Sequence, residues 1–152
     1  MRASMSGSAI GLHERNPTRR PTHLTPRIIV AEDDEEMRRL IVATLEKDGY
    51  YVEQVTDGMR LLVHVVALAD DPQRAFDLII SDLRMPASTG LQILRGLRNS
   101  GWKVPFILCT AFGDEPTRTD VENLDAIYFD KPFELDDLRK TVRSILLSNE
   151  KT

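Results

Sequence analysis

The sequence has one cysteine, no long hydrophobic run and no N-terminal apolar leader. Cys109 has no second cysteine with which to form an internal disulfide, and it lies in the apolar run VPFILCT over residues 104–110. Burial in such surroundings raises the pKa of a thiol and makes it inert, so we expect a structural role for Cys109. No apolar run approaches the roughly 18 residues that a membrane span requires, and the start of the chain lacks the apolar region of a secretory signal. These absences favour a cytoplasmic protein without a membrane contact.

Phosphate-binding loops and histidine clusters are missing as well. The sequence contains neither G-x-G-x-x-G nor G-x-x-x-x-G-K-[ST], which excludes the usual dinucleotide-binding and P-loop sites. The three histidines, His13, His23 and His64, are not spaced as metal ligands. We expect His64, which lies on a predicted helix, to have a structural role.

The net charge of −4 is spread unevenly along the chain. Residues 1–26 hold four arginines and one glutamate, whereas residues 27–152 hold 16 basic and 23 acidic residues. An acidic body is atypical of a nucleic-acid-binding protein, so we expect no direct contact of this chain with nucleic acid. The first segment is rich in Ser, Pro, Thr and Gly and lacks apolar periodicity. We predict a disordered basic arm over residues 1–26, for part of which a vector origin stays open, followed by one domain over residues 27–148 and a tail over residues 149–152.

Five short apolar segments alternate with five segments of helical periodicity. The pattern is clearest in the first helix, where Met37, Leu40, Ile41 and Leu45 recur at helical spacing after the capping residue Asp34. The predicted strands cover residues 27–32, 50–55, 76–81, 104–110 and 126–130, and the predicted helices cover residues 35–49, 59–70, 91–99 and 117–125 and most of the segment 131–149. This alternation predicts an α/β fold with a five-stranded parallel sheet, right-handed crossovers and helices on both faces.

Polar residues lie at the carboxyl ends of four of the five predicted strands. Glu32 and Asp33 lie at the end of the first strand, Asp82 at the end of the third, Thr110 at the end of the fourth and Lys131 at the end of the fifth. Ligands of parallel α/β sheets bind at the carboxyl ends of the strands. Clustered carboxylates repel one another unless a cation neutralises them, and oxygen ligands alone suit a hard ion such as Mg²⁺ or Mn²⁺. A carboxylate beside such an ion and a lysine can accept a phosphoryl group and form an aspartyl phosphate.

Each of these residues also has a simpler interpretation when taken alone. Asp82 is a suitable first residue for the turn before Pro86, and acids such as Glu32 and Asp33 are common at the start of a helix. Thr110 is an ordinary strand residue and Lys131 an ordinary surface lysine. Their joint placement at the strand ends favours the chemical interpretation.

Five motifs, IIVAEDDEEMRRL, DGMRLL, FDLIISDLRMP, VPFILCTA and IYFDKPF, occur in this order between about residues 27 and 147. Together they resemble the receiver domain of two-component response regulators, the CheY-like family. The resemblance implies a flavodoxin-like, doubly wound sheet with strand order 2-1-3-4-5. It also implies that Asp82 is the phosphoacceptor and that Mg²⁺ is held by Glu32, Asp33, Asp82 and the backbone carbonyl of Arg84.

The resemblance assigns further roles beyond the metal and the acceptor. Thr110 and Lys131 would each bind a phosphoryl oxygen, and Tyr128 would be the rotating aromatic switch. Arg84 and Phe112, two residues beyond the acceptor and two beyond the threonine, would flank the acceptor. Because Phe112 has no group to orient a hydrolytic water, we hypothesise a long-lived phosphoaspartate.

The implied function is phosphotransfer signalling. A sensor histidine kinase or a phosphotransfer protein would donate the phosphoryl group, and the only chemistry of the chain would be its own phosphorylation and dephosphorylation. The face formed by helix 117–125, strand 126–130 and the last helix would then bind an output protein, an effector domain or a second copy. Since helix 117–125 is short and has few apolar anchors, Val121 and Leu124, we predict that this face is mobile.

Two other functions remain open at this point. One is a degenerate receiver that acts by protein contact without phosphorylation, although every chemical position is filled. The other is a phosphohydrolase of the haloacid-dehalogenase type, which needs a second Asp two residues after the first, where this chain has Arg84.

Overall fold

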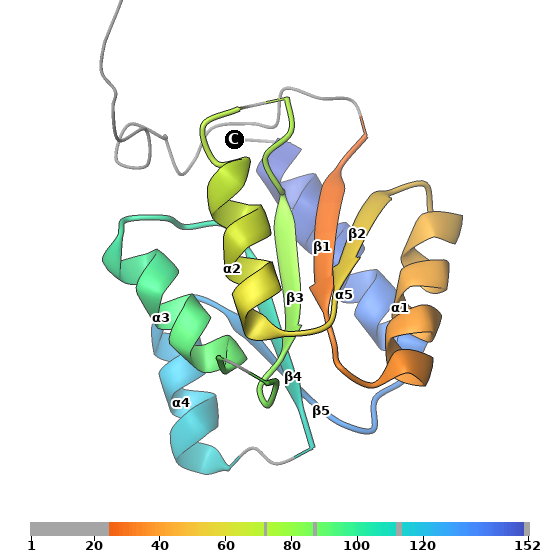
Figure 1. Cartoon of the computed structure of the whole chain (residues 1–152). Helices are drawn as coiled ribbons and strands as arrows, with labels where there is room; N and C mark the ends of the chain where they lie inside the picture. Colours follow the sequence, from red (N-terminus) through yellow and green to blue (C-terminus); the bar gives the residue numbers. More distant parts are fainter. Residues whose placement is uncertain (1–24, 72, 87, 112–113, 151–152) are drawn as a thin grey trace, which may run out of the picture.

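The computed structural model describes residues 25–71, 73–86, 88–111 and 114–150, so the predicted arm over residues 1–26 lies almost entirely outside the described residues. Within them, five strands alternate with five helices, as the sequence predicts (Figure 1). The elements are β1 (Arg27–Ala31), α1 (Glu35–Lys47), β2 (Tyr51–Val55), α2 (Gly58–Ala67), β3 (Leu78–Asp82), α3 (Gly90–Asn99), β4 (Phe106–Thr110), α4 (Glu115–Asn123), β5 (Ile127–Asp130) and α5 (Leu135–Glu150).

The strands form one sheet in the order β2-β1-β3-β4-β5, and all neighbouring pairs are parallel. This is the flavodoxin-like topology that the family resemblance implies. Because every strand runs in the same direction, the carboxyl ends of β1, β3, β4 and β5 meet at one edge, the lower edge in Figure 1. The order changes direction between β1 and β3, so this edge contains the topological switch point where ligands of such sheets bind.

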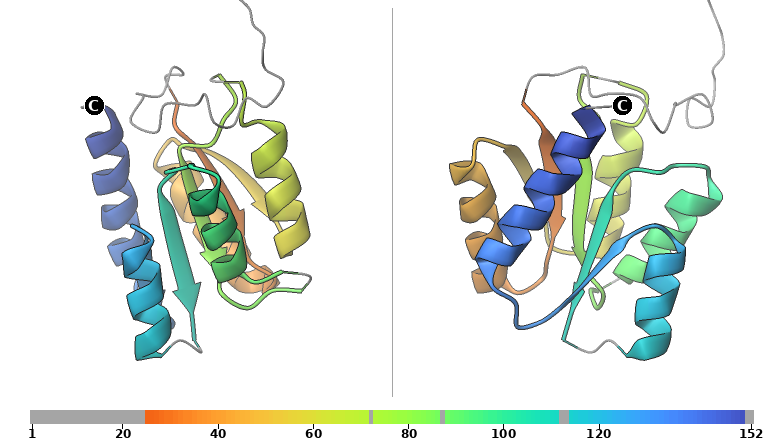
Figure 2. Two further views of the ribbon diagram at one scale, coloured as in Figure 1. Left: turned by 90° about the vertical axis from the view of Figure 1, so that its left-hand side faces the viewer. Right: turned by 180° about the vertical axis from the view of Figure 1, so that it is seen from behind.

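Alternate residues of each strand supply two separate hydrophobic cores. In β1, Ile28 and Val30 face one core and Ile29 and Ala31 face the other, as the two-residue period of a strand requires. The first core lies under α1 and α5 and contains their buried residues, Ile41, Val42, Leu45, Leu138, Val142 and Leu146. The second core lies under α2, α3 and α4 and contains Leu61, Val65, Ile93, Leu94, Leu97, Trp102 and Val121. Figure 2 shows the helices on the two sides of the sheet.

Capping residues set where the helices begin. Asp34 caps α1 as predicted, and Asp114 caps α4; the carboxylate of each accepts the backbone N–H of the third residue beyond it. Asp57 caps α2 in the same way, so α2 starts at Gly58, one residue earlier than predicted. It also ends at Ala67, three residues short of the predicted end. Thr89 and Gln92 form a reciprocal capping box at α3.

Two further predictions concern Cys109 and His64. Cys109 lies in β4 with 2% exposure, and burial raises the pKa of its thiol to about 12, so the predicted inert role is supported. His64 is half-buried on α2 and its Nδ1 lies 2.8 Å from the carbonyl oxygen of Arg60. None of the helices among the described residues is long and apolar enough to cross a membrane.

Candidate phosphoacceptor and metal site

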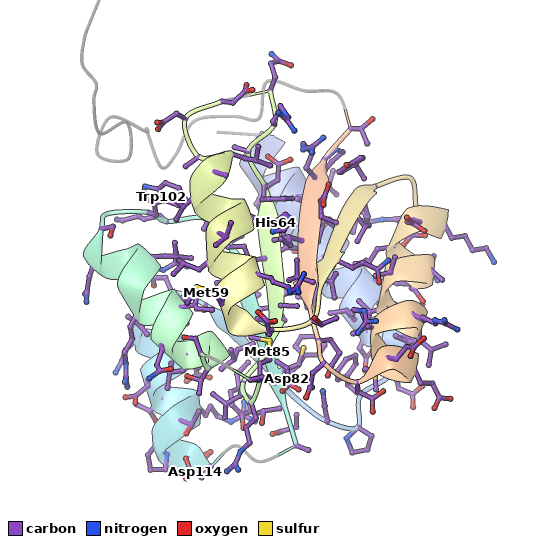
Figure 3. The ribbon with its side chains drawn as sticks, viewed as in Figure 1. Met59, His64, Asp82, Met85, Trp102 and Asp114 are labelled. Carbon is purple, nitrogen blue, oxygen red and sulfur yellow. The ribbon has the colours of Figure 1, made fainter. Side chains whose placement is uncertain are left out.

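Three carboxylates meet at the carboxyl edge of the sheet. Glu32 and Asp33 follow β1, and Asp82 is the last residue of the neighbouring strand β3. One oxygen from each lies within 4.8 Å of the others. Figure 3 shows Asp82 at this edge, below α2 and beside Met85. The predicted clustering of these acids is therefore present, and its ligand atoms are all oxygens.

Glu32 is the buried member of the group, with 2% exposure. Its Oε1 accepts a hydrogen bond of 2.6 Å from Nζ of Lys131, and its Oε2 accepts one of 3.1 Å from the backbone N–H of Asp34. Burial raises the pKa of Glu32 above its ordinary value, and the negative charge of Asp82 adds to the rise. The bond from Lys131 opposes both effects, but the net direction stays upward. This site therefore favours positive charge, whether a proton or a cation.

Lys131, which directly follows β5, contacts the acids at the ends of β1 and β3. Besides Glu32, its Nζ lies 3.2 Å from Oδ2 of Asp82. Burial alone would lower the pKa of Lys131, but the hydrogen bond to Glu32 and the charges of Asp82 and Glu32 raise it above the ordinary value. Its ammonium is therefore held in the charged form between the two carboxylates. The Lys131–Pro132 peptide bond that follows is cis.

The local sequence of β3 explains why Asp82 stays at the edge. Leu78, Ile79 and Ile80 are buried on both faces of the sheet, and the backbone of Asp82 pairs in register with Cys109 of β4. The start of α3 packs so closely here that a Cβ atom on Gly90 would meet the carbonyl oxygen of Asp82. The carboxylate is thus held by a buried strand and a tight loop, while its side chain keeps 11% exposure.

The backbone after Asp82 turns toward the acids. The backbone N–H of Arg84 lies 3.4 Å from Oδ1 of Asp82, and the Arg84 residue itself is exposed. The predicted role of its backbone carbonyl as a metal ligand stays a prediction. Phe112, the other residue predicted to flank the acceptor, lies outside the described residues.

Thr110 and Tyr128 lie on the two strands between the acids and α4. Thr110 ends β4 with 1% exposure, and its carbonyl accepts the backbone N–H of Lys131 at 2.9 Å. Tyr128 is buried in β5 and pairs in register with Leu108. Burial, with a further contribution from Asp130, raises the pKa of the Tyr128 hydroxyl. Thr110 therefore lies one residue beyond the register partner of Asp82, and Tyr128 lies three residues before Lys131.

Sequence reasoning missed Arg118, which lies on α4 and covers Tyr128. Its guanidinium carbon is 4.3 Å from the centre of the Tyr128 ring, and its Nη2 donates to Asp130 at 2.7 Å. Nothing in the linear pattern indicates this contact, because Arg118 and Tyr128 are ten positions apart and lie on different elements.

The end of α4 contains an unusual backbone conformation. Asp125, which directly precedes Ala126, adopts a left-handed conformation with φ of 55°. Arg98 of α3 compensates there, since it donates at 2.7 Å to the carbonyl of Leu124 and at 3.4 Å to that of Asp125. Val121 is the buried residue of α4, and Leu124 packs partly buried against the same core. This light anchoring agrees with the predicted mobility, which stays a prediction.

Comparison with known proteins identifies relatives of this chain. Residues 28–143 match the family model of the response regulator receiver domain. Response regulator protein PmrA of Pseudomonas aeruginosa is 40% identical over 122 residues, which cover 78% of this chain and 52% of the relative. The chain thus spans about half the length of the curated relatives that it matches.

Solved structures show the same fold. The receiver domain of the Francisella response regulator 1452 matches with a TM-score of 0.71 and 25% identity, over 81% of this chain and 98% of that domain. The chemotaxis response regulator CheY4 of Vibrio cholerae matches with a TM-score of 0.63 and 26% identity, over 80% of this chain and 99% of that protein.

Proposed function

This chain belongs to the receiver domain family of two-component response regulators, and we propose that it accepts a phosphoryl group on Asp82 in the presence of Mg²⁺. The observation that carries the proposal is the position of Asp82. Its carboxylate ends a buried strand, lies 3.2 Å from the ammonium of Lys131 and shares an edge with Glu32 and Asp33. A nucleophilic carboxylate, a fixed cation and two further acids are the groups that aspartyl phosphate formation needs.

The proposed reaction transfers a phosphoryl group from a phosphohistidine of a sensor kinase or phosphotransfer protein. A carboxylate oxygen of Asp82 attacks phosphorus, the N–P bond of the donor breaks, and its electron pair returns to the imidazole nitrogen. Lys131 donates to one phosphoryl oxygen and the Thr110 hydroxyl to another. Since Lys131 already contacts Glu32 at 2.6 Å, it can turn from Asp82 to the new oxygen and keep a carboxylate partner.

The residues fit a divalent metal because three carboxylates face one lysine. Glu32, Asp33 and Asp82 offer only oxygen ligands within 4.8 Å of one another, which suits Mg²⁺ or Mn²⁺. We propose that these acids and the backbone carbonyl of Arg84 hold the ion, which would neutralise charge on the transferring group. Glu32, which is buried, and Lys131, which is half-buried, orient the pocket through their hydrogen bond of 2.6 Å.

The proposed output is a change at the α4-β5-α5 face. A phosphoryl group adds up to two negative charges and three acceptor oxygens. Thr110 would move toward it, Tyr128 would rotate into the space released, and the face would change its affinity for an output protein, an effector domain or a second copy. This is a local charge event that biases a two-state element. Location in the cytoplasm, the histidine kinase as donor and the absence of other enzymatic activity belong to the same proposal.

The proposal also includes the domain boundaries. We take residues 27–148 as the receiver domain, with residues 1–26 as a disordered arm and residues 149–152 as a tail.

Arg84 and Phe112 are proposed to set the lifetime of the phosphoaspartate. If this is correct, radiolabelled phosphoprotein loses its label faster in the Phe112→Glu variant than in the parent chain. Unchanged or slower loss would count against a role for Phe112.

Intact mass spectrometry after incubation with acetyl phosphate and Mg²⁺ tests the main proposal. The parent chain should gain the mass of one phosphoryl group, and the gain should disappear with a chelator and in Asp82→Ala. Asp77→Asn is the matched control, because Asp77 is also buried and directly precedes β3, but at the opposite end of the strand. Absence of any gain in the parent chain would favour a degenerate receiver that acts by protein contact.

A further inference from the structure

Arg118 connects α4 to two residues of β5 at once. Its guanidinium carbon lies 4.3 Å from the centre of the Tyr128 ring, and its Nη2 lies 2.7 Å from Oδ2 of Asp130. Because Tyr128 and Asp130 are two residues apart on one strand, their side chains point to the same side of the sheet. A third contact, at 3.4 Å, joins Nε of Arg118 to Glu115 in the first turn of α4. One side chain therefore fixes the start of α4 against β5.

The residues that Arg118 holds are close to the proposed phosphorylation site. Asp130 directly precedes Lys131, whose ammonium contacts both Glu32 and Asp82. The backbone of Asp130 also pairs in register with Thr110. A displacement of the β5 backbone at Asp130 therefore changes the geometry of the contact between Arg118 and Asp130.

Other contacts hold α4 only lightly. Val121 is the buried residue of α4, and Arg95 of α3 forms an exposed ion pair of 2.7 Å with Asp120. Exposed ion pairs contribute little on their own. The stacking of Arg118 on a buried aromatic ring differs from them, because it ends as soon as the ring leaves its position.

We propose that Arg118 is a positioning residue of the switch, which holds the Tyr128 ring in its unphosphorylated position and couples that ring to α4. The inference rests on the proposed function of Asp82. While Arg118 stacks on the ring and binds Asp130, rotation of Tyr128 costs the loss of the stacking contact. Loss of one partly exposed cation–π contact shifts a two-state equilibrium by about two- to fivefold. Removal of Arg118 should therefore favour the rotated state by this factor.

The test uses the full chain labelled with 3-fluorotyrosine and observed by fluorine NMR. The Tyr128 resonance is assigned with Tyr128→Phe, and its rotated position is defined by adding beryllofluoride and Mg²⁺ as a phosphoryl mimic. In Arg118→Gln without the mimic, the resonance should move toward the rotated position, and acetyl phosphate should modify Asp82 about two to five times faster. Arg118→Lys keeps the charge and should restore part of the parent behaviour.

Arg95→Gln is the matched control. It removes an exposed arginine that pairs with α4 at the same distance of 2.7 Å but with Asp120 in place of Asp130. This control should leave the Tyr128 resonance and the rate of modification unchanged. If the parent chain accepts phosphoryl but Arg118→Gln behaves like Arg95→Gln, the inference is wrong and the proposed function stands. If the parent chain accepts neither phosphoryl nor its mimic, the proposed function fails and the inference fails with it.

Discussion

Replacing Lys131 with methionine removes the ammonium that lies between Glu32 and Asp82 and keeps an unbranched side chain of similar reach. The ammonium lies 2.6 Å from Glu32 and 3.2 Å from Asp82, and Glu32 is only 2% exposed. The variant therefore leaves a buried carboxylate without its counter-charge. Breaking a buried pair in this way typically costs about 3–5 kcal/mol of unfolding free energy.

The free energy of protonating Glu32 sets an upper limit on this cost, because a neutral carboxyl needs no counter-charge. This free energy depends on the pH. At pH 7.5, protonating a carboxyl whose ordinary pKa is 4.5 costs about 4 kcal/mol. At pH 5.5 the same step costs only about 1.4 kcal/mol. Loss of Lys131 raises the pKa of Glu32 in the folded state further. The destabilisation is therefore greatest above that folded pKa and shrinks as the pH falls toward 4.5. We expect a loss of about 2–4 kcal/mol at pH 7.5 and at most about 1.5 kcal/mol at pH 5.5.

Urea unfolding at the two pH values, with a chelator present, measures both quantities. Lys140→Met is the matched control, since Lys140 has a 75% exposed side chain and pairs only at the surface with Asp136. Adding Glu32→Gln to the Lys131→Met variant should recover part of the loss at pH 7.5. An equal loss at both pH values, or none at pH 7.5, would refute the reasoning that an uncompensated carboxylate causes the effect.

Three further predictions concern packing. Gly90→Ala should destabilise the chain by about 3 kcal/mol, because the new Cβ would collide with backbone and with a leucine side chain. Gly96→Ala should stabilise it by about 0.5–1 kcal/mol, because nothing lies within 4 Å of the added Cβ. Urea unfolding that ranks the two variants in the opposite order would contradict this. Val121→Ala should cost about 2 kcal/mol and speed amide exchange across α4 by more than tenfold, whereas unchanged exchange there would show that other contacts anchor this helix. Cys109, with a thiol pKa of about 12 and 2% exposure, should react with a thiol reagent only as fast as the protein opens, so rapid reaction of the native chain would contradict its burial.

The position of the site could be predicted because it follows from the parallel topology of the sheet. Once β1, β3, β4 and β5 are assigned as parallel strands, their carboxyl ends must share one edge. Glu32, Asp82 and Lys131 lie at these strand ends and are therefore brought together there. The strand assignments themselves rest on buried apolar runs, which the periodicity of a sequence reports well. The element boundaries were less accurate. β3 runs over Leu78–Asp82, where residues 76–81 were predicted, because the backbone of Asp82 still pairs with β4.

Side-chain contacts between elements could not be predicted in this way. The motif places Lys131 near two acids, but only the three-dimensional packing brings its ammonium closer to Glu32 than to Asp82. The stacking of Arg118 on Tyr128 depends on where α4 begins and how it lies over β5, which neither spacing nor composition specifies. The left-handed conformation of Asp125 likewise follows from the end of α4 and its contact with Arg98.

The helices around the site are anchored unequally, and this difference indicates which of them should move when the charge at Asp82 changes. On one face, α1 places three buried residues in the core, and α5 adds Leu138, Val142 and Leu146. On the other face, α4 buries Val121 alone among its described residues. Lys131 and Thr110, which would receive the phosphoryl oxygens, belong to the β4 and β5 side of the sheet. Because movement follows the contacts that cost least to break, we expect phosphorylation to rearrange α4 and leave α1 in place.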